Sequence, residues 1–142
     1  MRRLPVALPL ALLLGAVAGA AEPASEASTS FRIETGESTR QLRAGGDGKL
    51  VIDIVPLGGT HVNAEAPLKI SLSSTPGLKL SRQALGHRDA VDPGADGPRF
   101  VVPFQATGAG AQEARARVEF FICSDAWCVK QARDVAVAID VK

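Results

Sequence analysis

The feature that most constrains the fold is a period-two alternation of apolar and polar residues, repeated in short segments from Phe31 onwards. Leu50, Ile52 and Ile54 share one face of such a segment, and residues 68–72 repeat the pattern. Because successive side chains of a strand point to opposite faces, each segment predicts a half-buried β-strand. Further segments of this kind are residues 77–81, 100–105, 115–123 and 134–141.

Clusters of glycine, proline, aspartate and threonine separate these segments, as expected of turns between strands. Seven or eight short strands without a convincing amphipathic helix predict an all-β fold, an antiparallel β-sandwich of immunoglobulin-like type. A small barrel is the alternative. Gln83–Asp96 lacks the alternation and is rich in turn formers and charges. We expect a long loop there, of a length that is often functional or mobile.

The amino terminus has the composition of an export signal. Two arginines precede an apolar run from Leu4 to Val17, and small residues follow up to Ala20. This predicts a cleavable signal peptide over residues 1–20 and a periplasmic or secreted protein. The run contains two prolines and is short for a membrane span, so we expect no membrane insertion after cleavage. Residues 21–30 are small and polar, which predicts a flexible leader before a domain over residues 31–142.

Charge and motifs exclude several function classes. Without the two arginines of the signal, fourteen basic and fifteen acidic residues remain, so no basic patch predicts a nucleic-acid partner. His61, Asn63 and His87 do not have the paired short spacing of zinc ligands. No nucleophile elbow or glycine-rich phosphate loop is present in the sequence. We therefore expect no cofactor and no metal.

The only two cysteines, Cys123 and Cys128, stand between two alternating segments with a Cys-x4-Cys spacing. The spacing predicts a β-hairpin with a four-residue loop, and an exported chain predicts that the pair is oxidised. If the cysteines face each other, Arg117 faces Asp134 as an opposite-charge pair. The directly opposed Cα atoms then lie about 4.5–5.5 Å apart, which suits a disulfide.

Nearer the loop this register is less favourable. Val118 would face Arg133, and Phe120 would face Gln131. A bulge or a polar rim must therefore be allowed in this part of the hairpin.

Two interpretations of the cysteine pair remain open. A structural bridge is the first, although closing so short a loop stabilises by only about 2 kcal/mol. The second is a redox pair that exchanges with a partner, which needs an accessible sulfur and a resolving thiol. No helix begins at either cysteine to lower a thiol pKa. The pair is therefore better suited to being attacked by an activated thiolate than to attacking.

The segment from Glu119 to Cys128, EFFICSDAWC, near the end of a β-rich exported chain resembles the amino-terminal periplasmic domain of the thiol:disulfide interchange protein DsbD and its stand-alone relatives. The order of segments before the hairpin is also similar, so the resemblance covers most of residues 31–142, although only the hairpin is specific. It implies an immunoglobulin-like fold and a carrier of reducing equivalents. Cys123 and Cys128 match the redox pair of that family.

The resemblance further implies a thioredoxin-like partner in the periplasm or membrane and a possible role as a thiol–disulfide oxidoreductase component. It also implies a cap loop over the cysteines, for which Gln83–Asp96 is the candidate, with Leu85 and His87 as covering side chains. Phe121 shares the predicted cysteine face and can widen a docking patch. Trp127 either packs at the loop tip or presents a docking ring. The alternative function is a non-catalytic envelope sandwich with a structural disulfide.

Overall fold

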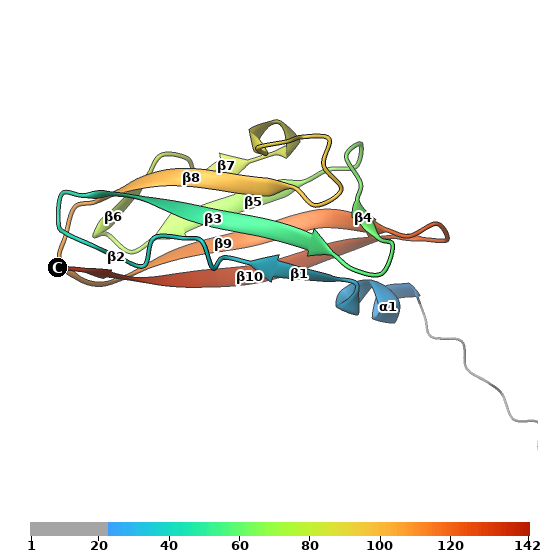
Figure 1. Cartoon of the computed structure of the whole chain (residues 1–142), viewed down its shortest axis with the longest axis horizontal. Coiled ribbons are helices and arrows are strands. Elements are labelled where there is room, and N and C mark those ends of the chain that lie inside the picture. Colours follow the sequence, from blue (N-terminus) through green and yellow to red (C-terminus); the bar gives the residue numbers. More distant parts are fainter. Residues whose placement is uncertain (1–22) are drawn as a thin grey trace, which may run out of the picture.

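The computed structural model describes residues 23–142, which form ten strands, one short α-helix and one 3-10 helix (Figure 1). The expected signal peptide and the first two leader residues lie outside this range. In chain order the elements are α1 (Pro23–Thr29), β1 (Phe31–Glu34), β2 (Gln41–Leu42), β3 (Asp47–Pro56), β4 (His61–Val62), β5 (Lys69–Ser74), β6 (Leu78–Leu80), β7 (Ala84–Leu85), η1 (His87–Asp89), β8 (Arg99–Ala106), β9 (Gly110–Cys123) and β10 (Cys128–Val141).

The strands form two sheets that pack face to face (Figure 1). Sheet A has the order β1-β3-β8-β6, and sheet B has the order β2-β10-β9-β5-β7, with β4 paired to the end of β9. All pairings in these two sheets are antiparallel except that of β2 with β10. The predicted all-β sandwich is therefore confirmed, and the alternative of a small barrel is wrong. The seven strands longer than two residues agree with the expected number, and β2, β4 and β7 are two-residue additions.

The core lies between the two sheets and consists of the inward-facing residues of the alternating segments. Phe100 and Phe120 are fully buried, and the Phe120 ring meets Phe31 edge to face with centroids 4.9 Å apart. Such a pair adds to the stabilisation that burial alone provides. The predicted inward residues that are buried are Leu50, Ile52, Ile54, Leu68, Ile70, Leu72, Leu78, Phe100, Val102 and Phe104.

Strands β9 and β10 form one continuous antiparallel hairpin. Its register pairs Cys123 with Cys128 and runs through fourteen pairs to Val141 and Gly110 without a bulge. The Arg117–Asp134 pair is among them, as predicted. Because the two strands of the hairpin are paired continuously along their length, sheet B fixes the position of the hairpin tip.

The bulge that we allowed near the loop is absent because the polar residues there find partners. Gln131 is 7% exposed, and its Oε1 accepts a hydrogen bond of 3.2 Å from Arg133. The Arg133 guanidinium lies 4.8 Å from the centroid of the Phe31 ring and donates a hydrogen bond of 3.0 Å to the Ser28 carbonyl. These cation–π and hydrogen-bond contacts satisfy the arginine in its half-buried position.

The expectation that residues 21–30 lack structure is wrong for Pro23–Thr29, which form α1. Figure 1 shows α1 beside the ends of β1 and β10, where it contacts both strands. The segment does bury a side chain, since Ala27 is fully buried in the core. The helix therefore closes the end of the sandwich that carries the cysteines. None of the helices in residues 23–142 has the length and apolarity needed to cross a membrane.

The long loop expected over Gln83–Asp96 is partly ordered into short elements. Leu85 in β7 pairs with Ile70, and η1 follows directly. Beyond η1 the segment returns to the hairpin end of the molecule, where the Asp96 carbonyl accepts a hydrogen bond of 2.8 Å from the Val62 amide.

Candidate functional site

The candidate site is the disulfide at the tip of the β9–β10 hairpin. Cys123 is the last residue of β9 and Cys128 is the first of β10, and the bonded residues have Cα atoms 4.1 Å apart. The loop between them is closed by a hydrogen bond of 2.8 Å from the Ser124 amide to the Trp127 carbonyl. The Ser124 hydroxyl also accepts hydrogen bonds from the Ala126 and Trp127 amides, at 3.1 and 3.3 Å. Turn chemistry and strand register thus hold the two cysteines together.

The two cysteines differ in exposure. Cys123 is only 2% exposed, and it lies between two paired strands, with β4 on one side and β10 on the other. Cys128 is exposed. Among the described residues, β10 has a second partner strand only at Asp140 and Val141, at its far end. A reagent can therefore approach Cys128 from the open edge of sheet B.

The disulfide faces away from sheet A, on what we call the outer face of sheet B. Phe121 and Lys130 are the next pair on this face, and Phe121 is half-buried. The Lys130 ammonium lies 4.0 Å from a Glu119 carboxylate oxygen. The predicted docking residue Phe121 therefore does share a face with the cysteines, next to a pair of opposite charges.

Trp127 is the last residue of the hairpin loop, directly before β10. Its indole packs against the core cluster, and its Nε1–H donates a hydrogen bond of 3.0 Å to the Glu26 carboxylate of α1. Of the two roles we considered for Trp127, this geometry agrees with packing. A small hollow surrounds the contact, lined by Glu26, Thr29, Ser30, Leu57, Gly58, Thr60, Ser124, Ala126 and Trp127.

Sequence reasoning missed Glu26 because the contact joins residues 101 positions apart. The only signal was an acidic residue in a segment that otherwise looked unstructured. Helix α1 thus contacts the tip of the hairpin through the hydrogen bond between Glu26 and Trp127.

Leu85 does not lie over the disulfide. Leu85 is 7% exposed and belongs to the core. Leu85 pairs with Ile70, which in turn pairs with Val118 of β9. Val118 precedes Cys123 by five residues, so Leu85 lies at a level about 17 Å from Cys123 along β9. His87 Nε2 makes a hydrogen bond of 2.7 Å with the Ala66 carbonyl. Leu85 therefore contributes to packing and not to a cover over the cysteines.

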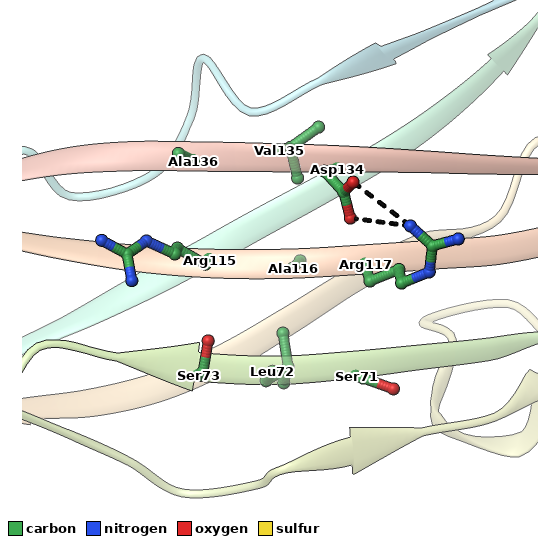
Figure 2. Close-up of a pocket in the computed structure, with 9 residues that line it drawn as sticks. All are labelled: Ser71, Leu72, Ser73, Arg115, Ala116, Arg117, Asp134, Val135 and Ala136. Carbon is green, nitrogen blue, oxygen red and sulfur yellow. Dashed lines mark hydrogen bonds and ion pairs between the residues drawn. The ribbon is translucent and has the colours of Figure 1, made fainter.

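The strands β5, β9 and β10 form a shallow hollow on the outer face of sheet B, shown in Figure 2. At one end of it the Arg117 guanidinium binds both carboxylate oxygens of Asp134 at 3.2 Å. Arg115 points the other way and pairs with Glu113. Arg117 precedes Cys123 by six residues, about 20 Å along β9. The hollow is therefore separate from the disulfide, and its charges are already paired.

Two of the three titratable groups with shifted pKa values, Asp53 and Arg99, lie in sheet A, and the third, Glu37, lies in the connection between β1 and β2. The Arg99 guanidinium pairs with Glu37 and with Asp53, the latter at 3.3 Å. The hydrogen bond from Arg99 lowers the pKa of Glu37 and raises that of Arg99, whereas burial raises the pKa of Asp53 against the opposing charge of Arg99. This cluster stabilises sheet A and has no cysteine within it. Nowhere in residues 23–142 do three or more histidine, cysteine or acidic residues converge as a metal site would require.

No protein-family model matches the chain, and no curated protein sequence matches it. Among solved structures, the native conformation of Escherichia coli alpha-2-macroglobulin is 19% identical with a TM-score of 0.49, over 80% of this chain and 7% of that one. A conjugative transposon lipoprotein from Bacteroides eggerthii is 13% identical with a TM-score of 0.43, over 75% of this chain and 96% of that one. AggA, the major subunit of an Escherichia coli aggregative adherence fimbria, is 10% identical with a TM-score of 0.39, over 79% and 94%. At such identities none of the three assigns a function to the chain.

Proposed function

We propose that this protein is an exported thiol–disulfide exchange domain that carries reducing equivalents, related in role to the amino-terminal domain of DsbD that its hairpin resembles. One observation carries the proposal: the Cys123–Cys128 bridge lies at an open sheet edge with Cys128 exposed. Exchange requires that a thiolate reach one sulfur of the bridge. Cys128 meets that requirement.

The bridge is also poorly placed to act as a structural staple. It joins residues five apart in a hairpin whose strands are already paired at thirteen further positions. The chain-entropy relation gives such a short closed loop about 2 kcal/mol, less than most native disulfides contribute. A bridge that adds little stability can open and close without unfolding the domain.

The exposure difference indicates which sulfur reacts. A partner thiolate attacks Cys128 Sγ, the Cys123–Cys128 bond breaks, and Cys123 Sγ leaves as a thiolate that takes up a proton. The second thiol of the partner then attacks its own sulfur in the mixed disulfide and releases Cys128. Two electrons and two protons have passed to the domain, and the partner has become a disulfide. The reverse sequence delivers them to an oxidised acceptor.

The partner is a thioredoxin-like protein with an activated thiolate. No helix begins at either cysteine, so the domain lacks the dipole that lowers a thiol pKa in many redox proteins. An attacking thiolate must therefore come from the partner in the first step. Phe121 and Lys130, beside the disulfide on the outer face of sheet B, offer an apolar and a charged contact to such a protein.

One observation favours the alternative, a non-catalytic envelope sandwich with a structural bridge. Cys123 is 2% exposed, and buried disulfides resist exchange when neither sulfur can be reached. The two candidates therefore differ in one measurable property, the reactivity of Cys128 in the folded protein.

Trapping of a mixed disulfide tests the proposal. The oxidised domain is mixed with a thioredoxin variant that retains the attacking cysteine and lacks the resolving one, and the adduct is mapped by peptide mass spectrometry. We expect a one-to-one adduct at Cys128. The Cys123→Ala/Cys128→Ala double variant is the control and forms none. Absence of any adduct with folded wild-type protein would favour the structural bridge.

A further inference from the structure

Strand β4 brings a histidine next to the disulfide. His61 is the direct partner of Cys123 in the β4–β9 ladder, and Cys128 is the partner of Cys123 on the other side. Directly opposed residues of an antiparallel ladder point their side chains to the same face, with Cβ atoms about 4.5–5.5 Å apart. The side chains of His61, Cys123 and Cys128 thus form one row across three strands.

The order within this row matters for the chemistry. The approach to Cys128 is from the open edge of β10, on the side away from Cys123. The leaving sulfur is therefore Cys123 Sγ, which lies toward β4. His61 is half-buried, and within the part of the chain that the structure describes its ring is not among the side chains that hydrogen-bond to protein groups. The imidazole stands at the leaving-group end of the disulfide with its nitrogens uncommitted.

We infer that His61 is the proton-transfer residue for Cys123: its imidazolium stabilises and protonates the Cys123 thiolate as it leaves. This inference rests on the proposed exchange function and assigns its proton step. When the disulfide is attacked, the Cys123–Cys128 bond breaks, its electron pair goes to Cys123 Sγ, and the proton passes from His61 to that sulfur. When the dithiol is reoxidised, the neutral imidazole takes the proton back as Cys123 attacks Cys128 Sγ of the mixed disulfide.

A histidine suits this step because its charge changes between about pH 5 and 8, where thiol exchange operates. An adjacent positive charge lowers a thiol pKa by roughly one unit or more, and a less basic sulfur leaves faster. Together these effects predict a reaction that is roughly three- to tenfold faster with the imidazolium than without it.

The other charged groups near His61, Cys123 and Cys128 either form an ion pair or lie in neighbouring loop segments. Lys130 is next to Cys128 on the outer face and pairs with Glu119. Asp125 is exposed in the hairpin loop, and Asp96 meets β4 through its backbone carbonyl.

The remaining neighbours on the outer face carry no proton to the row. Asn63 Oδ1 accepts hydrogen bonds from the Glu65 and Ala66 amides, at 2.9 and 3.2 Å. Phe121 has no titratable group. His61 is therefore the titratable residue that the register places directly against Cys123.

The test compares His61→Gln with His87→Gln, which removes the only other histidine of the chain. The disulfide of the mature protein is reduced with dithiothreitol across about pH 5 to 9, and each rate constant is divided by the fraction of reagent thiolate. We expect the corrected constant to rise as the pH falls in wild type and in His87→Gln. In His61→Gln it should be independent of pH and roughly three- to tenfold lower at pH 6. Equal profiles in all three folded proteins would overturn the inference.

A second measurement needs no His61 variant. The imidazole signals of the wild-type protein are followed by NMR against pH in the oxidised and reduced forms, with His87→Gln to assign the two rings. We expect the pH midpoint of the His61 signal to change on reduction and that of His87 to stay the same. An unchanged His61 midpoint overturns the inference even where His61→Gln does not fold.

These outcomes are separable from failure of the proposed function. Dithiothreitol reduces the bridge without a protein partner, so the His61 profile is informative even if no thioredoxin-like protein reacts. If instead a thioredoxin variant forms the Cys128 adduct while the His61→Gln profile equals that of wild type, the exchange function stands and the role of His61 is wrong.

Discussion

Reduction of the Cys123–Cys128 disulfide is expected to lower the free energy of unfolding by no more than about 2 kcal/mol. The bridge closes a loop between residues only five apart, so little entropy returns to the unfolded chain when it opens. In the folded state the hairpin keeps its other pairs, and Ile122, next to Cys123, stays fully buried. With an unfolding entropy of about 2.1 cal/mol/K per residue over residues 31–142, this corresponds to a fall in Tm of about 9 °C at most.

The assay is thermal and urea unfolding followed by circular dichroism, for the oxidised protein and for the protein held in a phosphine reductant. The Cys123→Ala/Cys128→Ala double variant, which cannot reoxidise, serves as a second comparison. We expect all three forms to unfold cooperatively with similar urea dependence. A loss of more than about 4 kcal/mol on reduction, or the disappearance of a cooperative transition, would refute the reasoning and support a structural bridge.

Further predictions concern the core, the helix contact and the acidic cluster. Phe120→Ala should destabilise by about 3–5 kcal/mol because the ring is fully buried, whereas Phe121→Ala, on the outer face, should cost well under half of that; equal losses in urea unfolding would contradict the assigned faces. Trp127→Ala should cost roughly 2 kcal/mol, since a half-buried indole loses its packing against the core and its bond to α1; an unchanged urea midpoint would show that α1 does not support the hairpin. Because the folded-state pKa of Glu37 is lowered by Arg99, its stabilisation is present above the unfolded-state pKa and is lost as the pH falls through the folded-state value. Glu37→Gln should therefore be less stable than wild type at pH 7 and equal to it near pH 2, and a difference that stays constant with pH would be inconsistent with this ion pair.

Much of the fold follows from local patterns. Alternation of apolar residues predicted six of the seven longer strands. The placement of Cys123 opposite Cys128 predicted the register of the hairpin away from its loop. Both succeed because a strand that buries one face allows little freedom in register: a shift by one residue would expose its apolar side chains.

The features that the sequence did not reveal depend on contacts between distant residues. Strand β4 has two residues, too few for periodicity, and only its pairing with β9 brings His61 to Cys123. Helix α1 is a seven-residue segment of small and polar residues, and isolated helices of that length do not form in water. Its order comes from Ala27 in the core and from the bond between Glu26 and Trp127.

Of the bulge or polar rim that the pattern allowed opposite Phe120, the bulge is absent for the same reason. The local pattern placed Gln131 and Arg133 on the inner face without partners. The structure supplies partners from elsewhere: the Phe31 ring and the Ser28 carbonyl hold the arginine, and the arginine holds the glutamine.

The equilibrium reduction potential of the Cys123–Cys128 pair tests the central claim most directly. The folded domain is equilibrated in glutathione buffers of graded ratio, or with a thioredoxin couple of known potential, and its thiols are counted by mass spectrometry after acid quenching. If the domain carries reducing equivalents, the reduction potential of the Cys123–Cys128 pair should be about −270 to −180 mV, within the range of thioredoxin-like and disulfide isomerase couples. A value below about −300 mV, where structural disulfides typically lie, would contradict it.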